Sequence, residues 1–321
     1  MVGNQLPRVG TLGEILVEIM AEDIGDGFRE PIRLIGPFPS GAPAIFIDQV
    51  AKLGHPCGII GCVGDDDFGR LNVERLQSDG VDVSAIHVDP EQATGTAFVR
   101  YRENGDRDFV YNIRNSASGG TSVREPGLKM LHECGHLHVM GSSLFSSDII
   151  ENAKTAVALV KQNGGTISFD PNIRKEMLTI REMRTALEFM LRSCDVFLPS
   201  SSELLMLTEA TGEAEAISRA FAHGVSNIVV KRGVEGATYH DVNGSASSPA
   251  FGVEEIDPTG AGDCFDAAFV TFRLRGESVE ESLRYANACG ARAVCVRGPM
   301  EGTSTLAELT AFMASTATGP S

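Results

Sequence analysis

Short apolar runs alternate along most of the chain with segments in which apolar residues recur every three or four positions. The apolar runs predict buried strands at 58–63, 136–140, 166–170, 196–199 and 227–231. The periodic segments between them predict helices, among them 45–53, 147–163, 180–192 and one that starts at Ser278 with a Ser-x-x-Glu capping box. Strands that alternate with helices favour parallel βαβ units. The alternation therefore predicts an α/β fold. Because the sequence contains no repeat, linker or low-complexity block, we expect one main domain over residues 1–321.

Two regions depart from this alternation. Residues 11–38 and 94–113 have the pattern of exposed strands joined by charged turns, and Glu103 to Asp106 is typical of a hairpin turn.

Composition limits the classes of partner. The chain carries 27 Lys and Arg against 43 Asp and Glu, a net charge of −16, which disfavours nucleic acid and acidic membrane surfaces. The chain shows neither a membrane-spanning run nor a signal peptide at its amino terminus, so a cytoplasmic location is expected. The seven cysteines form no Cys-x-x-Cys pair and are expected to be reduced and mostly buried.

The stretch DPTGAGDCFDAAF, residues 257–269, carries the most specific chemistry. Its apolar residues share one helical face, so a helix should start near Gly260. The free N–H groups and the dipole of a helix start favour an anion, and the amides of Gly260, Ala261 and Gly262 would hold it. Asp263 beside a bound phosphate makes sense as a base that accepts a hydroxyl proton, which is the arrangement of phosphoryl transfer. The alternative is an ordinary glycine turn with an Asp in the first helical turn.

Asp-x-Thr-Gly-Ala-Gly-Asp resembles the carboxy-terminal signature of the ribokinase-like (PfkB) carbohydrate kinases, and the resemblance extends along nearly the whole chain. It implies a three-layer αβα fold with a mostly parallel central sheet. It also implies a small β-sheet lid from about 11–38 and 94–113 that covers the sugar and often joins a homodimer. ATP and Mg²⁺ are the implied cofactors, with K⁺ as a further possibility near Asp257, which would also hold the turn. The alternative for the lid is a surface hairpin without catalytic consequence.

The resemblance implies sugar-binding positions. Gly41 and Ala42 match the family's amino-terminal signature within PSGAPAIF, whereas Ile45 replaces an Asn that often touches the sugar. Glu18 takes the place of an acidic residue that contacts sugar hydroxyls, with a solvated strand residue as the alternative. Arg114 in YNIRNSASG and Arg174 in DPNIR resemble arginines that face the sugar pocket; a salt bridge on the lid surface is the alternative for Arg114.

The resemblance also implies a nucleotide and metal site. Glu203 would position Mg²⁺ through water, with Ser200 in place of the family's Asn, and the same pair could form a capping box. The implied nucleotide-binding positions are Lys231, Gly233, Gly236, Thr259 and Asn287. A plain turn at 230–237 and core packing around Asn287 are the alternatives.

The sequence therefore predicts ATP-dependent phosphorylation of a sugar hydroxyl. GEILVEI, PSGAPAIF and DPNIR resemble the ketohexose and 2-keto-3-deoxygluconate kinase branches of the family more than its nucleoside kinases. Within these branches we expect a ketohexose such as tagatose or fructose, and 2-keto-3-deoxygluconate is the alternative substrate. A non-catalytic sugar or nucleotide sensor on the same fold is the alternative of a different class. The chain has no Gly-x4-Gly-Lys-Ser/Thr motif, which argues against a P-loop kinase. His136 and His138 alternate along a predicted strand, so structural histidines are favoured there over a zinc site.

Overall fold

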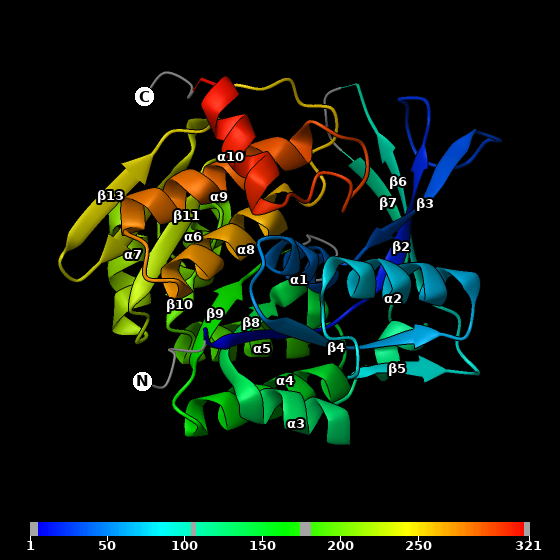
Figure 1. The fold of residues 1–321 in the computed structure, drawn as a ribbon, viewed down its shortest axis with the longest axis horizontal. Coiled ribbons are helices and arrows are strands. Elements are labelled where there is room, and N and C mark those ends of the chain that lie inside the picture. Colours follow the sequence, from blue (N-terminus) through cyan, green and yellow to red (C-terminus); the bar gives the residue numbers. More distant parts are fainter. Residues whose placement is uncertain (1–5, 104–106, 174–180, 318–321) are drawn as a thin grey trace.

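The computed structural model describes residues 6–103, 107–173 and 181–317. Within these ranges the larger sheet has nine strands, flanked by helices on both faces (Figure 1). In spatial order its strands are β13 (Gly244–Ser248), β12 (Ala237–Asp241), β11 (Asn227–Lys231), β10 (Val196–Phe197), β9 (Thr166–Asp170), β8 (Cys134–Met140), β1 (Arg8–Leu12), β4 (Cys57–Gly64) and β5 (Ile86–Asp89).

Neighbouring strands from β11 to β5 are parallel, and β12 and β13 form an antiparallel hairpin at one edge. This confirms the prediction of parallel βαβ units. β9 and β11 have the predicted bounds, whereas β10 ends at Phe197, two residues earlier than expected. The reason is local: Pro199 has no N–H to donate to a neighbouring strand, and Ser200 already caps the next helix.

Two groups of helices bury the two faces of the sheet. On one face lie α1 (Ala42–Lys52), α2 (Asp67–Asp79), α8 (Ala261–Leu274), α9 (Val279–Val294) and α10 (Leu306–Ser315). On the other lie α3 (Glu125–Glu133), α4 (Ser147–Gln162), α5 (Arg181–Ser193), α6 (Ser201–Thr208) and α7 (Glu213–Ala222). The predicted helix starts at 147 and at Ser278 are confirmed, because the hydroxyls of Ser146 and Ser278 accept the N–H groups of Ile149 and Glu281.

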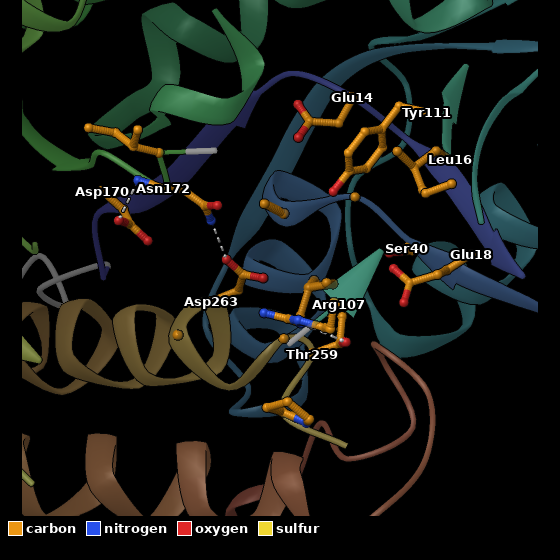
Figure 2. A pocket seen from close by; sticks show the side chains of 18 of the residues that line it. Glu14, Leu16, Glu18, Ser40, Arg107, Tyr111, Asp170, Asn172, Thr259 and Asp263 are labelled. Atoms are coloured by element: carbon orange, nitrogen blue, oxygen red, sulfur yellow. Dashed lines mark hydrogen bonds between the residues drawn. The ribbon is translucent and has the colours of Figure 1, made fainter. Parts of the chain in front are cut away.

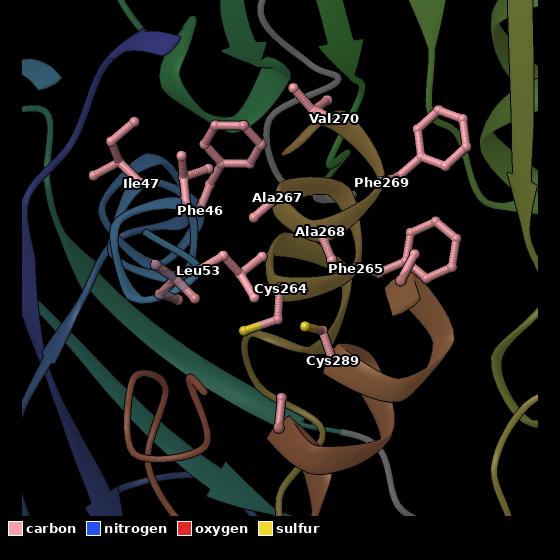
Figure 3. Packing of buried hydrophobic residues seen from close by; sticks show 14 of the residues in the cluster. Phe46, Ile47, Leu53, Cys264, Phe265, Ala267, Ala268, Phe269, Val270 and Cys289 are labelled. Atoms are coloured by element: carbon pink, nitrogen blue, oxygen red, sulfur yellow. The ribbon is translucent and has the colours of Figure 1, made fainter. Parts of the chain in front are cut away.

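Helix α8 lies between α1 and α9 (Figure 3). Its small residues Cys264, Ala267 and Ala268 allow the three helices to approach closely, while Phe265 and Phe269 are 6% and 2% exposed. Burying each phenylalanine contributes about 2 kcal/mol. The entrance of α8 is therefore held by a well-packed helix.

A smaller sheet projects from the larger one. Within the described residues it has four strands, in the order β3 (Leu34–Ser40), β2 (Leu16–Ala21), β6 (Gly95–Tyr101) and β7 (Arg107–Asn112). β6 and β7 form the predicted antiparallel hairpin; residues 104–106 of its turn lie outside the described residues.

The expectation that residues 11–38 are exposed strands is wrong in part. Residues 11 and 12 end β1 in the centre of the large sheet, and most of β2 is buried. β2 is an interior strand that pairs with β3 and β6 along its two edges, and it also packs against α2.

Among the described residues, no helix has the length and apolar character needed to cross a membrane.

Candidate active site

A cavity of about 280 Å³ lies between the two sheets, at the carboxyl ends of the parallel strands. Ligands of open α/β sheets bind at this edge, because loops from several strands converge there. Figure 2 shows side chains from both sheets and from the entrance of α8 directed into the cavity. The lining residues used below are Glu14, Glu18, Ser40, Gly41, Ala42, Ile45, Arg107, Tyr111, Asp170, Asn172, Ser200, Glu203, Lys231, Thr259, Gly260, Gly262 and Asp263.

The predicted helix start is confirmed. Gly260 is the N-cap of α8 with φ 81°, and a Cβ there would lie 2.5 Å from the carbonyl oxygen of Pro299. Both the backbone conformation and the close approach therefore require glycine. Asp263 stands in the first turn of α8 and is 7% exposed.

Asn172, which follows β9, contacts Asp263 across the cavity. Its Nδ2 donates a hydrogen bond of 3.1 Å to Asp263 Oδ1 (Figure 2), and its own N–H donates to Asp170 Oδ1 at 3.0 Å. Sequence reasoning missed Asn172, although it selected the DPNIR stretch for Arg174. The signal was a polar residue directly after the carboxyl end of a buried strand.

Lys231, at the end of β11, forms a buried ion cluster. Its Nζ lies 2.9 Å from Asp170 Oδ2 and 3.0 Å from Asp266 Oδ2. Burial alone lowers the pKa of Lys231, but the attraction of the two carboxylates outweighs it and raises the pKa, so the ammonium stays charged. Lys231 Nζ is also 3.7 Å from the position that a Cβ of Gly262 would take. Sequence reasoning did not select Asp266, a buried charge in the middle of an apolar helix.

The turn before α8 is tied to the smaller sheet. Asp257 is 1% exposed, and its carboxylate accepts hydrogen bonds from the hydroxyl of Tyr101 and from the N–H groups of Thr259 and Gly298, the latter two at 3.0 and 2.9 Å. Arg107 Nη1 lies 3.3 Å from Thr259 Oγ1. Two side chains of the smaller sheet thus contact the residues that precede the helix entrance.

The part of the cavity nearest the smaller sheet is acidic. Glu14 is 2% exposed and accepts hydrogen bonds from the hydroxyls of Ser142 at 3.0 Å and Ser143 at 2.5 Å. Glu18 is 4% exposed, which excludes the alternative of a solvated strand residue. Gly41 closes this part with φ 113°, and a Cβ there would lie 2.4 Å from the carbonyl oxygen of Glu14.

Glu203 forms the predicted capping box with Ser200, and its Oε1 also accepts the N–H of Ile173 at 2.7 Å. The carboxylate therefore fixes the chain that follows β9 to the start of α6. Because Glu203 and Ser200 also line the cavity, the capping role is compatible with a role near a metal.

A second cavity of about 480 Å³ adjoins the first and shares Lys231, Pro258 and Gly262 with it. Besides Lys231, its lining includes Ala261 and three more of the predicted nucleotide-binding residues, Gly233, Gly236 and Asn287. Asn287 Nδ2 donates to the carbonyl oxygens of Ser248 and Pro249 at 3.0 and 3.3 Å. The entrance of α8 therefore lies at the junction of a polar and a more apolar cavity.

Two predicted arginines do not contribute to the described lining. Arg114 is exposed and is absent from the lining of the 280 Å³ cavity, whereas Arg107, which sequence reasoning did not select, is present. Arg174 lies outside the described residues. His136 and His138 are buried on β8, where both rings hydrogen-bond to the hydroxyl of Ser168.

Comparisons with known proteins agree with this geometry. The model of the pfkB family of carbohydrate kinases matches residues 38–306. The chain is 32% identical to the fructokinase of Vibrio alginolyticus over 86% of this chain and 91% of that protein. It is 30% identical to the fructokinase of Escherichia coli over 91% of this chain and 95% of that protein.

Solved structures share the fold. A candidate ribokinase II of Escherichia coli, in complex with ATP and Mg²⁺, superposes with a TM-score of 0.92 and 53% identity over 96% of this chain and 99% of that one. A double mutant of the Vibrio cholerae fructokinase, with fructose, ADP and a potassium ion bound, gives a TM-score of 0.84 and 28% identity over 96% of this chain and 99% of that one. These similarities confirm the predicted three-layer α/β fold with its smaller second sheet.

Proposed function

Because the chain belongs to the pfkB family of carbohydrate kinases, we propose that this phosphotransferase moves the γ-phosphoryl group of ATP to a hydroxyl of a neutral ketohexose. Fructose and tagatose are the first candidates. The fructokinase relatives support a ketohexose, and the paired cavities support two small substrates that meet at the entrance of α8.

One observation carries the proposal: Asp263 lines the polar cavity one residue after Gly262, which lines both cavities. In the proposed reaction a sugar hydroxyl oxygen attacks the γ-phosphorus, and a new P–O bond forms. The bond from the γ-phosphorus to the β,γ-bridging oxygen breaks, and ADP keeps its electron pair. The hydroxyl proton passes to Asp263.

The main chain and Asn172 support this step. The amides of Gly260, Ala261 and Gly262 stand at the positive end of the α8 dipole, where they stabilise charge on the phosphoryl oxygens. The hydrogen bond from Asn172 fixes the orientation of the Asp263 carboxylate at the helix entrance.

The charge of the cavity supports a neutral sugar. Glu14 and Glu18 line the part nearest the smaller sheet, and their carboxylates accept hydrogen bonds from hydroxyl groups readily. The alternative substrate, 2-keto-3-deoxygluconate, would bring its own carboxylate close to these two acidic side chains. Gly41 and Ala42 would close the same part of the cavity around the sugar.

ATP would occupy the cavity of 480 Å³, with its phosphates at the junction near Lys231 and Thr259 and its base near Asn287. Mg²⁺ would neutralise charge on the β- and γ-phosphates, and Glu203 is the carboxylate that would hold its water ligands. This arrangement suits a metal that reaches the site with phosphates, because Mg²⁺ usually retains waters and binds few protein groups. K⁺ near Asp257 and a homodimer through the smaller sheet remain predictions; the Vibrio cholerae fructokinase with bound potassium supports the former.

A coupled assay of ADP release tests the proposal. The purified chain is incubated with ATP, Mg²⁺ and one of several sugars: ketohexoses, aldohexoses, pentoses and keto-deoxy acids. We expect ADP release with fructose or tagatose and with none of the other sugar classes. Activity confined to 2-keto-3-deoxygluconate would overturn the assigned substrate. Saturable binding of sugar and ATP without ADP release would instead support the alternative of a sensor.

A further inference from the structure

Arg107 begins β7 and reaches the turn in front of α8. Its Nη1 lies 3.3 Å from Thr259 Oγ1, and Thr259 immediately precedes Gly260, the N-cap of the helix. Figure 2 shows the guanidinium of Arg107 close to Thr259 at this side of the cavity. A cationic side chain of the smaller sheet therefore lies beside the amides that would hold the γ-phosphoryl group.

We propose that Arg107 is a further catalytic residue, which donates hydrogen bonds to the γ-phosphoryl oxygens during transfer. The proposal rests on the kinase function proposed above and adds to its Mg²⁺ and Lys231 a guanidinium from the smaller sheet. In the transition state negative charge spreads over the phosphoryl oxygens, and the planar fork of a guanidinium matches this charge better than an ammonium does.

The side chain of Arg107 is held in place by its neighbours on β7. Its guanidinium lies over the ring of Phe109, 5.5 Å from the ring centroid, and Phe109 stacks on Tyr111 with centroids 4.9 Å apart. Residues 107, 109 and 111 alternate along the strand and so share one face. Tyr111 lines the polar cavity as well. One strand face thus connects the part of the cavity proposed for the sugar with the part proposed for the phosphate.

The partner strand fixes the same end of the hairpin. Tyr101 of β6 pairs with Arg107 of β7, and its hydroxyl donates to the buried carboxylate of Asp257 and lies 3.1 Å from Thr259 Oγ1. Burial and the adjacent Asp257 raise the pKa of Tyr101, so the phenol remains a hydrogen-bond donor. The contacts of Tyr101 therefore fix the end of the hairpin that carries Arg107 against the entrance of α8.

Of the two cationic side chains in the described lining, Arg107 is the one without a carboxylate partner among the described residues. Among the described lining residues, the cationic side chains are Arg107 and Lys231. Two buried carboxylates already balance Lys231, at 2.9 and 3.0 Å. By contrast, no ion pair within residues 6–103, 107–173 and 181–317 involves Arg107. Its charge is therefore available for an anionic ligand.

The test compares Arg107→Ala and Arg107→Lys with Arg102→Ala. Arg102 is a matched control, because it lies on the same hairpin, pairs with Asp108 at 2.5 Å and does not line the cavity. We expect Arg107→Ala to lower kcat by about 10²-fold or more, with the KM values for sugar and ATP changed only a few-fold, because the contact acts in the transition state. Arg107→Lys should recover only a small part of the rate, and Arg102→Ala should retain wild-type kinetics.

A second readout separates catalysis from folding. Guanidinium ion added to Arg107→Ala should restore part of kcat, and the variant should bind ADP, Mg²⁺ and aluminium fluoride with sugar more weakly by a factor similar to the loss in kcat. An unchanged kcat would overturn the inference, and so would a raised sugar KM with normal kcat, which would make Arg107 a sugar ligand. Failure of the proposed function itself would appear earlier, as wild-type chain that releases no ADP with any sugar.

Discussion

The hydrogen bond of 3.1 Å from Asn172 Nδ2 to Asp263 Oδ1 joins the loop after β9 to the first turn of α8. It connects two segments that are 91 residues apart in the sequence. Asn172 itself has φ 39°, a left-handed conformation that asparagine tolerates better than most residues. The side chain proposed as the base is thus oriented by a residue whose own backbone conformation is unusual.

Asp263→Asn should lower kcat by about 10²- to 10⁴-fold, because the amide cannot accept the hydroxyl proton. The sugar and nucleotide dissociation constants should change little, since the side chain keeps its size. Steady-state kinetics and calorimetric titration measure the two effects. Asp67→Asn is the matched control, because Asp67 also stands in the first turn of a helix and is exposed. Retention of normal turnover in Asp263→Asn would remove the base from the mechanism.

The fold was largely predictable because apolar periodicity reports burial directly. β9 and β11 are flanked by helices on both faces, and their apolar runs gave the correct bounds. β2 was misread because its charged and polar neighbours suggested exposure. Its burial depends on β3, β6 and α2, contacts that no local pattern encodes.

The site was predictable where one local motif carries the chemistry, as at Gly260 to Asp263. Residues that reach the cavity from other elements were missed. Arg107 resembled any charged residue near a hairpin turn, and Asp266 appeared only as a polar interruption of an apolar helix. Their positions depend on contacts between distant segments, such as that of Arg107 with Thr259.

Glu18→Gln should raise the KM for the sugar by about 10-fold or more, because a neutral amide accepts hydroxyl hydrogen bonds more weakly than a carboxylate. The KM for ATP should stay within a few-fold of the wild-type value. Glu22→Gln serves as the control, since Glu22 is exposed just beyond the same strand. Equal changes in both KM values would show that Glu18 affects the whole site instead of the sugar.

Lys231→Met should destabilise the fold by about 3–5 kcal/mol, because it leaves the carboxylates of Asp170 and Asp266 buried without their cation. Chemical denaturation at pH 7 measures the loss. The double variant Lys231→Met with Asp266→Asn should recover part of it, since one of the two buried acidic groups is then removed. If both variants unfold at the wild-type denaturant concentration, the ion cluster does not stabilise the fold.

Asp48 should make the stability of the fold depend on pH. It lies on α1 with a side chain that is 0% exposed, accepts a hydrogen bond of 2.7 Å from Thr303 Oγ1, and stands 3.4 Å from Arg75 Nη2. Burial raises the pKa of Asp48 to about 7; Arg75 opposes this rise and Asp79 adds to it. The folded state therefore binds the Asp48 proton more tightly than the unfolded chain does.

Because the folded state binds this proton more tightly, the free energy of unfolding falls as the pH rises. The contribution of protonated Asp48 to stability is complete below a pH of about 4, where the unfolded chain is protonated too, and is lost as the pH rises through about 7. Asp48→Asn cannot ionise, so its free energy of unfolding relative to wild type should increase between pH 4 and pH 8 by up to about 4 kcal/mol, at 1.36 kcal/mol per pKa unit. Urea unfolding of both proteins across this range measures the change. A difference independent of pH would show that the carboxyl group is ionised throughout, with Arg75 as its counter-ion.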